Sequence, residues 1–596
     1  MAAALSRALK LPGKKGPDLG EYDPLTQADS EDESEEDDLV LNYPRNGLGR
    51  DSRPGSGSAK LLGGRAGRRA GARGEAPEDE PLGATGVAVH GTDPEEKRRR
   101  ARRAIRSAFF LVPLVCAALI VLLSAFLIPC RNANLQRRLQ WERALGAAGG
   151  ITSAPLALWD VNGDSLEDVI VGVTESPNGT HAPGSKGPVC SVVALSAVGG
   201  QRRVSKVTAA PVMYIQGGPR HPGQEAPAVV LISRSTMTAV DGSTGKTVWS
   251  APLRDIESQA LLLPDLDGDS VPDLLVATLP ADKASDLSLS LVSGLTGMKL
   301  GRPLSFNVTA QGKLIGPLLH QTQKEAFYVL FGLGNIEAIS LWDVYLAATG
   351  QMPVNQSLQR KDPVLEGLRR SNSSFIHLNS SSHLSLDLVS RLNSSRSDWV
   401  LVDATNALSA LRPEDMFKRW TFSAGPIHSQ PAPGHFNDDG VPDLFIQSSA
   451  NGIMQAQVVD GASGRRLWAA EFVCPRVRLE ASAVSTSAGQ SAFLFWASEP
   501  IRAQESITKA TAAAEPLIRR LFLLYPAYPT VLLELLNTTD TAVSSAVSYR
   551  DRQKDATYVV VSLRPTPESQ PGAWTVSSTS LRAAVAKGSA VRLQQS

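Results

Sequence analysis

The sequence predicts an all-β propeller of seven or eight blades, preceded by one transmembrane helix and a disordered tail. Two repeats indicate the propeller. An acidic turn leads into a short apolar strand at three places, beginning at Asp160, Asp265 and His435. A glycine turn that leads into a strand with tryptophan occurs as "AVDGSTGKTVWS" and "VVDGASGRRLWAA". Repeated turn-and-strand units are typical of propellers. The third observation is an uncharged segment, residues 107–129, which is long enough to cross a bilayer as a helix.

The charge balance and the cysteine content limit the classes of protein. The 596 residues carry 60 Lys and Arg against 59 Asp and Glu, so the chain lacks the basic excess of a nucleic-acid-binding protein. Four cysteines are too few for a disulfide scaffold, and the core must come from packing. One disulfide, between Cys190 and Cys474, would join an early and a late part of the ring. Cys130 is placed to link two chains next to the membrane.

We expect residues 1–96 to form a disordered cytosolic tail, because they combine few aromatics with many charges. Ser30 and Ser34 lie in the acidic run "DSEDESEEDD" and resemble acidophilic kinase sites. "YDPL" at Tyr22 fits a tyrosine-based sorting signal. The alternative is a solvated tail in which these matches are incidental.

The uncharged segment reads as an uncleaved signal anchor. The basic run in residues 97–106 is denser than the basic residues that follow the segment, so the N-terminus is predicted to be cytosolic and the rest extracellular or lumenal. The domain boundaries follow: tail 1–96, basic segment 97–106, anchor 107–129, stalk 130–150, propeller 151–596.

Glycosylation sequons agree with this orientation, because they occur only after the segment and glycans are added only on the lumenal side. The acceptor asparagines are Asn178, Asn307, Asn355, Asn372, Asn379, Asn393 and Asn537.

The acidic turns have the residue types of a calcium loop. In "DLDGDSVPDLLVA" the carboxylates stand at positions 1, 3, 5 and 9, with a glycine at position 4. Calcium prefers six to eight hard oxygen ligands, which such a loop can largely supply. An EF-hand is excluded because position 12 is not Glu and a strand follows. The alternative is a polar turn without metal. The predicted ligands are Asp265, Asp267, Asp269 and Asp273, then Asp160, Asn162, Asp164 and Asp168, then Asn437, Asp439 and Asp443. His435 stands at position 1 of the third turn, and calcium disfavours its nitrogen.

These turns resemble the calcium-binding turns of FG-GAP repeats in integrin alpha-chain propellers. The layout of tail, anchor and glycosylated ectodomain resembles a small family of single-pass, integrin FG-GAP-like proteins of obscure function. The resemblance implies structural calcium. It does not imply integrin-like ligand recognition, because the FG half of the motif is mostly missing. The tryptophan turns resemble the blade-closing element of quinoprotein-like propellers, in which Trp249 and Trp468 would dock on a neighbouring blade.

Turn spacing sets the number of blades. From Asp160 to Asp265 there are 105 residues, and from Asp265 to His435 there are 170. Two blades of about 53 residues and three of about 57 fit these intervals, somewhat above the usual blade length. About three more blades fit the remainder. We therefore expect eight blades, or seven if the last segment closes an earlier blade.

The expected function is a membrane-anchored module that binds another protein on the extracellular or lumenal side, at the cell surface or in the secretory pathway. The alternatives are a trafficking or folding helper and, less favoured, an ectoenzyme with a pocket on the propeller axis. The sequence has no recognisable nucleophile elbow, zinc helix or phosphate loop. We therefore predict no catalytic residue and no cofactor other than Ca2+.

Overall fold

The computed structural model describes residues 140–593 with internal gaps, the longest of which are 176–188 and 502–517, and before them only residues 115–117 and 119. The chain divides into two units, residues 49–134 and the remainder. The tail with Ser30 and Ser34, the basic segment and most of the predicted anchor lie outside the described residues. Among the residues that are described, no helix is long and apolar enough to cross a membrane. Val115, Cys116, Ala117 and Leu119 are helical and exposed.

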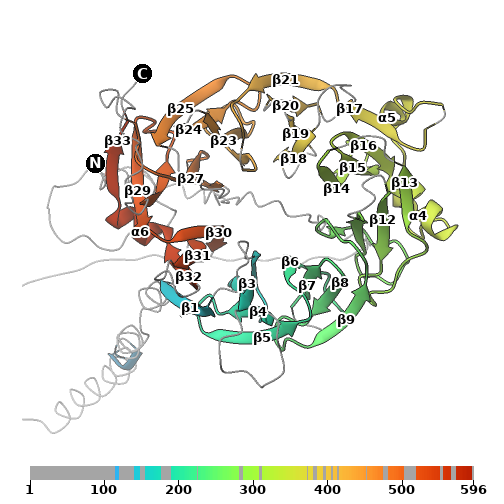
Figure 1. Ribbon diagram of the computed structural model, residues 1–596, viewed down its shortest axis with the longest axis horizontal. Helices are drawn as coiled ribbons and strands as arrows, with labels where there is room; N and C mark the ends of the chain where they lie inside the picture. Colours follow the sequence, from blue (N-terminus) through green and yellow to red (C-terminus); the bar gives the residue numbers. More distant parts are fainter. Residues whose placement is uncertain are drawn as a thin grey trace, which may run out of the picture. The chain divides into compact units, whose positions relative to one another are not determined.

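The described strands form eight antiparallel sheets arranged around a ring (Figure 1). In Figure 1 the fourth strands, such as β5, β9, β21 and β25, lie at the outer rim. Blade 1 consists of β2 (Leu156–Trp159), β3 (Asp168–Glu175), β4 (Val189–Leu195) and β5 (Arg202–Thr208). Blade 2 consists of β6 (Val212–Gly217), β7 (Val229–Ser233), β8 (Thr236–Val240) and β9 (Thr247–Pro252), and blade 3 of β10 (Leu261–Leu262), β11 (Leu274–Thr278), β12 (Asp286–Val292) and β13 (Leu304–Asn307). Blade 4 consists of β14 (Leu314–Gln321), β15 (Phe327–Leu333), β16 (Ile336–Ser340) and β17 (Ile376–Asn379). Blade 5 consists of β18 (Leu386–Asn393), β19 (Asp398–Asp403), β20 (Ala407–Leu411) and β21 (Lys418–Ser423). Blade 6 consists of β22 (Ala432–Gly434), β23 (Asp443–Ala450), β24 (Ile453–Val459) and β25 (Arg466–Val473).

The last two blades contain both ends of the ring. Blade 7 has β26 (Ser482–Ser485), β27 (Ser491–Ala497), β28 (Arg519–Leu524) and β29 (Val531–Thr538), and β33 (Ser589–Arg592) adds a fifth strand to its edge. Blade 8 has β30 (Thr541–Arg550), β31 (Asp555–Arg564) and β32 (Ala573–Ser580), and its fourth strand is β1 (Trp141–Ala147). Trp141 pairs with Ser578 and Ala147 with Ala573. The N-terminal strand therefore closes the ring.

This closure settles the number of blades at eight and corrects one predicted boundary. The predicted stalk, residues 130–150, contains β1, so the ring begins at Trp141 and not at residue 151. The segment "WERALGA" has no clear alternation of apolar and polar residues. Its strand conformation comes from pairing with β32, which is more than 400 residues later in the chain.

The core lies between adjacent blades. One cluster joins Phe445 and Phe472 of blade 6 to Phe493, Phe495 and Phe522 of blade 7. Strand β27, inside its sheet, is buried along its whole length, whereas β25 at the rim alternates between exposed and buried residues. Strands covered on both faces are continuously apolar, and half-covered strands alternate. The polar residues on the outer strands also protect these edges from pairing with other chains.

Four tryptophans on outer strands fasten one blade to the next. The indole Nε1–H groups of Trp141, Trp249, Trp420 and Trp468 donate to the main-chain oxygens of Ala197, Gly294, Gly461 and Pro529, at 2.8–3.0 Å. The predicted docking of Trp249 and Trp468 is confirmed. Trp141 and Trp420 were not predicted, because neither follows the aspartate-glycine turn that marks the other two.

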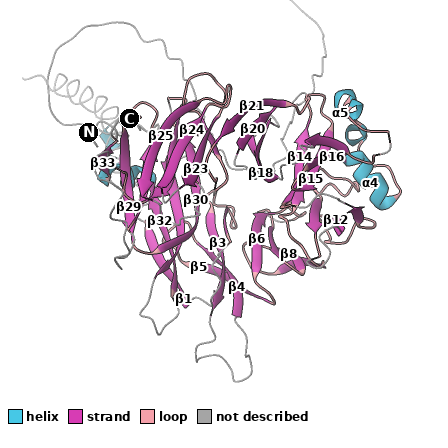
Figure 2. Cartoon of the chain, turned by 45° about the horizontal axis from the view of Figure 1, so that its top comes forward, coloured by secondary structure: helices cyan, strands magenta, loops and turns pink. Residues whose placement is uncertain are grey.

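Blade 4 carries a helical insertion between β16 and β17, drawn in cyan in Figure 2. It contains α4 (Leu341–Thr349), the 3-10 helix η1 (Gln356–Gln359) and α5 (Pro363–Gly367). Ser340 caps α4 by accepting the N–H of Asp343, and Gly350 ends it in the left-handed conformation. A further helix, α6 (Leu581–Lys587), lies between β32 and β33.

Candidate functional site

The three acidic turns occupy the same place in blades 1, 3 and 6, between the first and second strands. In blade 3, Asp265 folds the turn around its carboxylate, which accepts the N–H groups of Gly268 at 2.7 Å and Ser270 at 2.9 Å. Gly268 has a φ of +89°, a conformation that glycine adopts without strain. Asp269 accepts the N–H of Val271 at 2.8 Å. The spacing of the aspartates therefore shapes the turn through hydrogen bonds to its own main chain.

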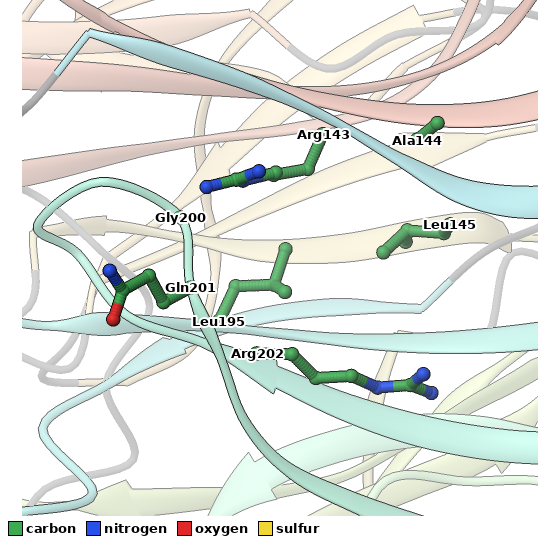
Figure 3. Close-up of a pocket in the computed structure, with 7 residues that line it drawn as sticks. All are labelled: Arg143, Ala144, Leu145, Leu195, Gly200, Gln201 and Arg202. Carbon is green, nitrogen blue, oxygen red and sulfur yellow. The ribbon is translucent and has the colours of Figure 1, made fainter.

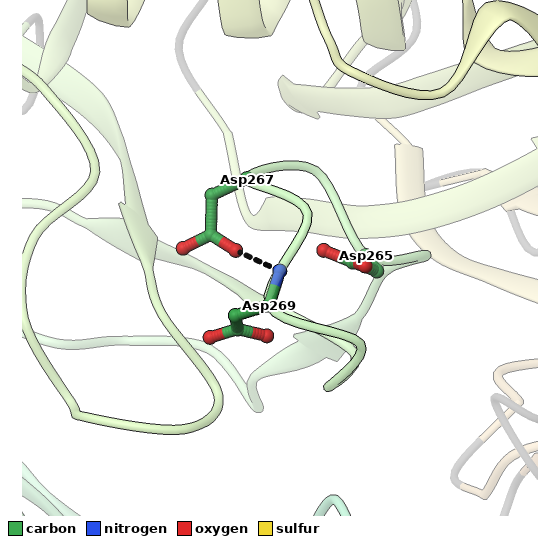
Figure 4. Close-up of side chains that lie close together, drawn as sticks. All are labelled: Asp265, Asp267 and Asp269. Carbon is green, nitrogen blue, oxygen red and sulfur yellow. Dashed lines mark hydrogen bonds between the residues drawn. The ribbon is translucent and has the colours of Figure 1, made fainter.

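The blade 3 turn also brings three carboxylates together (Figure 4). One oxygen each from Asp265, Asp267 and Asp269 lies within 4.8 Å of the others. Among the described residues this is the one such group of His, Cys, Asp or Glu side chains. Burial raises the pKa of Asp267, and the charges of Asp269 and Asp265 raise it further. A divalent cation would relieve this repulsion, and three hard oxygens match the chemistry of calcium.

The fourth predicted ligand of blade 3, Asp273, has a different arrangement. Its side chain is fully buried, and its two oxygens accept the N–H groups of Leu266 at 2.8 Å and Gly294 at 3.1 Å. It thereby ties the acidic turn to the turn between the third and fourth strands of the same blade. Burial raises the pKa of Asp273 to about 7.

The same buried aspartate recurs in blades 1 and 6. Asp168 accepts the N–H of Ala197 at 2.8 Å, and Asp443 accepts those of Phe436, Asn437 and Gly461. Both side chains are fully buried, and burial raises the pKa of each to about 6. Position 9 therefore links two turns within a blade, a role that the spacing did not predict.

In blade 1 an arginine side chain lies beside the acidic turn. A guanidinium nitrogen of Arg203 on β5 lies 3.7 Å from Asp164 Oδ2, and another lies 3.6 Å from Asp168 Oδ2. The side-chain amide of Asn162, which is also a predicted ligand, donates to Asp164 Oδ2 at 2.9 Å. Asp160 accepts the N–H groups of Gly163 and Ser165, both at 2.8 Å. Arginine, amide and main-chain donors thus surround Asp160 and Asp164, whereas the buried Oδ2 of Asp168 has the Arg203 charge nearby but no hydrogen bond to a described residue.

The blade 6 turn is held mainly by its main chain. The N–H of His435 donates to Ser491 Oγ at 3.0 Å, and its carbonyl accepts the N–H of Ser491. Asn437 donates weakly to Asp439 at 3.4 Å, and Asp439 accepts the N–H of Val441 at 2.8 Å. The imidazole that replaces the first aspartate leaves this turn with fewer oxygen ligands than blade 3.

The helical insertion of blade 4 lies against the blade 3 turn. A Cβ atom added at Gly268 would lie 3.4 Å from the methyl groups of Val354. Burial, and then the charges of Asp267 and Asp273, raise the pKa of Tyr345 on α4. The acidic turn therefore borders a segment that the sequence did not single out.

Apolar side chains are exposed on this insertion and on the neighbouring turn of blade 3. Met352 is 60% exposed and Val354 is 69% exposed. We name this set the insertion patch: Met298, Leu346, Met352, Val354 and Val364. Exposed apolar groups next to charged ones are typical of protein-binding surfaces.

The structure places two of the predicted glycosylation acceptors on the surface. Asn355, at the start of η1, and Asn537 in β29 are exposed. Asn307, Asn379 and Asn393 each end a strand, and their side chains are not described. Asn178 and Asn372 lie outside the described residues. Glycosylation stays a prediction.

The disulfide predicted between Cys190 and Cys474 is not supported. Cys190 on β4 of blade 1 is a buried free thiol that accepts a weak hydrogen bond from Thr174 Oγ1 at 3.9 Å. Cys474 lies outside the described residues, directly after β25 of blade 6. Blades 7 and 8 separate these strands, which places their sheets too far apart for a link of this kind.

Comparison with known proteins identifies the family. Residues 141–596 match the family described as FAM234A/B beta-propeller. FAM234B of Mus musculus is 37% identical over 612 residues, with 100% of this chain and 96% of the mouse protein covered. FAM234B of Homo sapiens is also 37% identical, over 614 residues with the same coverage. FAM234A of Bos taurus is 28% identical over 507 residues, covering 82% of this chain and 88% of the bovine protein. The matched region begins at the closing strand β1, and the chain belongs to the FAM234A/B β-propeller family.

Proposed function

We propose that this protein is a membrane-anchored interaction module that binds another protein through the insertion patch. The exposed apolar side chains of the patch carry this proposal, because four of them, Leu346, Met352, Val354 and Val364, occur within one short insertion, and exposed apolar groups that gather on one segment are typical of interaction sites. Apolar contacts at the centre of an interface, with charged groups around them, give both affinity and orientation. We assign the protein a binding function and no catalytic one.

Calcium in the blade 3 turn would have a structural role next to this patch. Neutralising Asp265, Asp267 and Asp269 would hold the turn in one conformation and thereby support Val354, which packs beside it. The ion would shape the edge of the interface and would not act on a substrate.

We further propose that residues 107–129 anchor the protein with its propeller on the extracellular or lumenal side. The uncharged segment, the preceding basic run and the position of every sequon after it support this orientation. In sealed microsomes, added protease should remove the tail and leave the propeller protected, and a glycosidase should shift the mobility of the protected fragment. Digestion of the propeller from the cytosolic side would contradict it.

Photo-crosslinking tests the interaction surface. A photoreactive amino acid at Met352 of the full-length chain in cells should give one discrete adduct with another protein. The double variant L346D/V354D, with the photoreactive group still at Met352, should lose that adduct because charge disfavours an apolar interface.

The matched control places the same group at Val207, which is 71% exposed on β5 of blade 1. An adduct of the same size and yield from Val207 would show non-selective labelling and would contradict the assignment. Persistence of the Met352 adduct in L346D/V354D would also contradict it.

A further inference from the structure

An acceptor for N-linked glycosylation lies within the insertion patch. Asn355 begins the sequon "NQS", directly after Val354 and three residues after Met352. All three side chains are exposed. Because the Cα atoms of neighbouring residues are only about 3.8 Å apart, any group attached to Asn355 lies beside Val354. A modification of this asparagine therefore occurs in the patch itself.

This part of the insertion is fixed in position. Pro353 and Leu358 are buried on either side of Asn355, and Leu358 belongs to the core cluster between blades 3 and 4. Gln359 Nε2 donates to the carbonyl of Pro353 at 3.3 Å, and the N–H of Leu358 donates to the carbonyl of Asn355 at 3.1 Å. The first sugar of a glycan on Asn355 would therefore stay next to Val354.

The side chain of Asn355 leaves its amide nitrogen available. Its Oδ1 accepts the N–H of Ser357 at 3.0 Å and the hydroxyl of Ser357 at 2.8 Å. Its Nδ2, the atom that carries an N-linked glycan, has no hydrogen-bond partner among the described residues. At Asn537, the other acceptor whose side chain is described as exposed, Nδ2 donates to Glu534 Oε1 at 3.0 Å. The folded insertion thus accommodates a glycan on Asn355 without loss of a hydrogen bond.

We propose that Asn355 carries an N-linked glycan that covers the insertion patch, so that only chains with an unmodified Asn355 bind the partner protein there. This regulation rests on the binding surface and the lumenal orientation proposed above. A glycan is bulky and hydrated. A partner that docks on Val354 would have to remove water from the sugar hydroxyl groups, which costs free energy unless each group finds a new hydrogen-bond partner. The occupancy of this one sequon sets the fraction of chains that can bind.

The same glycan would protect the unbound protein. Met352 and Val354 are 60% and 69% exposed, and exposed apolar patches favour unwanted association. A glycan beside these two side chains covers them in chains that have no partner. Shielding and binding then exclude each other at one surface.

Cysteine labelling measures the shielding without any partner. The full-length Met352→Cys protein, made in animal cells and purified in a neutral detergent, is treated with a small maleimide or with a maleimide attached to polyethylene glycol. Mass spectrometry gives the occupancy of Asn355. We expect a glycan on Asn355, and we expect the bulky reagent to react severalfold faster when Asn355→Gln is added. The small reagent should change little, and the protein without Met352→Cys gives the background from its native cysteines.

Matched variants separate the effect of the glycan from that of the side chains. Ser357→Ala also removes the sequon and should unmask residue 352 as Asn355→Gln does, whereas Ser357→Thr keeps the sequon and the shielding. Asn537→Gln removes an acceptor in blade 7 and should leave the labelling of residue 352 unchanged. The control position for the label is Arg202→Cys in blade 1, an exposed residue that lines the cavity shown in Figure 3. Its labelling should be the same with and without Asn355→Gln.

Crosslinking then connects the glycan to the partner. With the photoreactive group at Met352, Asn355→Gln and Ser357→Ala should each increase the yield of the partner adduct severalfold, and Asn537→Gln should not. The adduct of the parent chain should consist of molecules that have no glycan on Asn355.

Three results would overturn the proposal: an unmodified Asn355 throughout the mature protein, equal labelling of residue 352 by the bulky reagent in parent and Asn355→Gln, or a glycosylated Asn355 in the partner adduct. Absence of any adduct in Asn355→Gln, with the shielding still measured by labelling, would instead contradict the proposed binding surface. The two proposals therefore fail separately.

Discussion

Blades 1 and 3 contain the same acidic turn but balance its charge in different ways. In blade 1, Arg203 lies beside Asp164 and Asp168. In blade 3, Leu300 stands at the corresponding place, three residues after the turn glycine, and three carboxylates face one another. Aspartate spacing therefore predicts the turn, whereas the residue three places after the turn glycine decides whether the protein itself supplies a positive charge to it.

The largest expected loss of stability comes from removing the buried aspartate at position 9 of the turn, which both blades contain. Asp273→Ala removes the acceptor of two buried N–H groups, Leu266 and Gly294. It should lower the free energy of unfolding by about 3 kcal/mol, because buried donors without partners are costly. Urea unfolding followed by tryptophan fluorescence measures this. The control is Asp267→Ala in the same turn, which should cost far less. Equal losses of stability in the two variants would show that the hydrogen bonds of the buried Asp273 contribute no more than the exposed turn does.

Calcium should affect the stability of blade 1 and blade 3 variants differently. Asp265→Ala with Asp269→Ala should lower the stability by about 2 kcal/mol in saturating calcium, since bound ligand stabilises the folded state. In chelator the loss should be smaller, because the hydrogen bonds to Gly268, Ser270 and Val271 are still removed but the repulsion between the carboxylates is relieved. Thermal unfolding in both conditions checks this. The counterpart Asp160→Ala with Asp164→Ala should show no calcium-dependent loss. An unchanged calcium response in the blade 3 variant would exclude the metal there.

Exchanging the residue types at positions 203 and 300 should exchange the calcium responses of the two turns. Leu300→Arg should abolish the calcium response of blade 3 by supplying a guanidinium to its turn. Arg203→Leu should cost up to about 1 kcal/mol in chelator, since partly exposed ion pairs contribute little, and should create a calcium response in blade 1. Calcium titration monitored by Tm measures both. If Leu300→Arg still responds to calcium as the parent does, residue 300 does not control the site.

The smallest effect concerns pH. Burial raises the pKa of Asp443 to about 6, above its value in the unfolded chain. The folded state then binds this proton more tightly, so its contribution to stability increases as pH falls from 7.5 to 5. In chelator this should amount to about 1 kcal/mol relative to Asp443→Asn. Unfolding of both proteins at the two pH values measures the difference. A parallel pH dependence in parent and variant would contradict the assignment.

Much of the ring was predictable because its signals are local. Aspartate turns and the tryptophans after glycine turns mark blades through short-range geometry, and their spacing led to seven or eight units. The closing strand had no such signal. "WERALGA" contains several good helix formers and becomes a strand only through β32.

The electrostatic difference between the turns also depends on distant contacts. Arg203 lies 39 residues after Asp164, and their proximity follows from the four-strand meander of blade 1. The patch on blade 4 was missed for a related reason. Its apolar residues look like core residues in the sequence, and only the fold shows that they face solvent.

The two-ended construction of blade 8 has a consequence for synthesis. Strand β1 leaves the ribosome among the first parts of the propeller, whereas its partner β32 is made more than 400 residues later. Throughout that interval β1 has no strand to pair with, and the blades already made form an open ring. The nascent chain therefore carries an unpaired edge beside the start of the ring until translation is nearly over. A premature stop before Ala573 would leave that edge permanently exposed, and we expect cellular quality-control factors to recognise such a form.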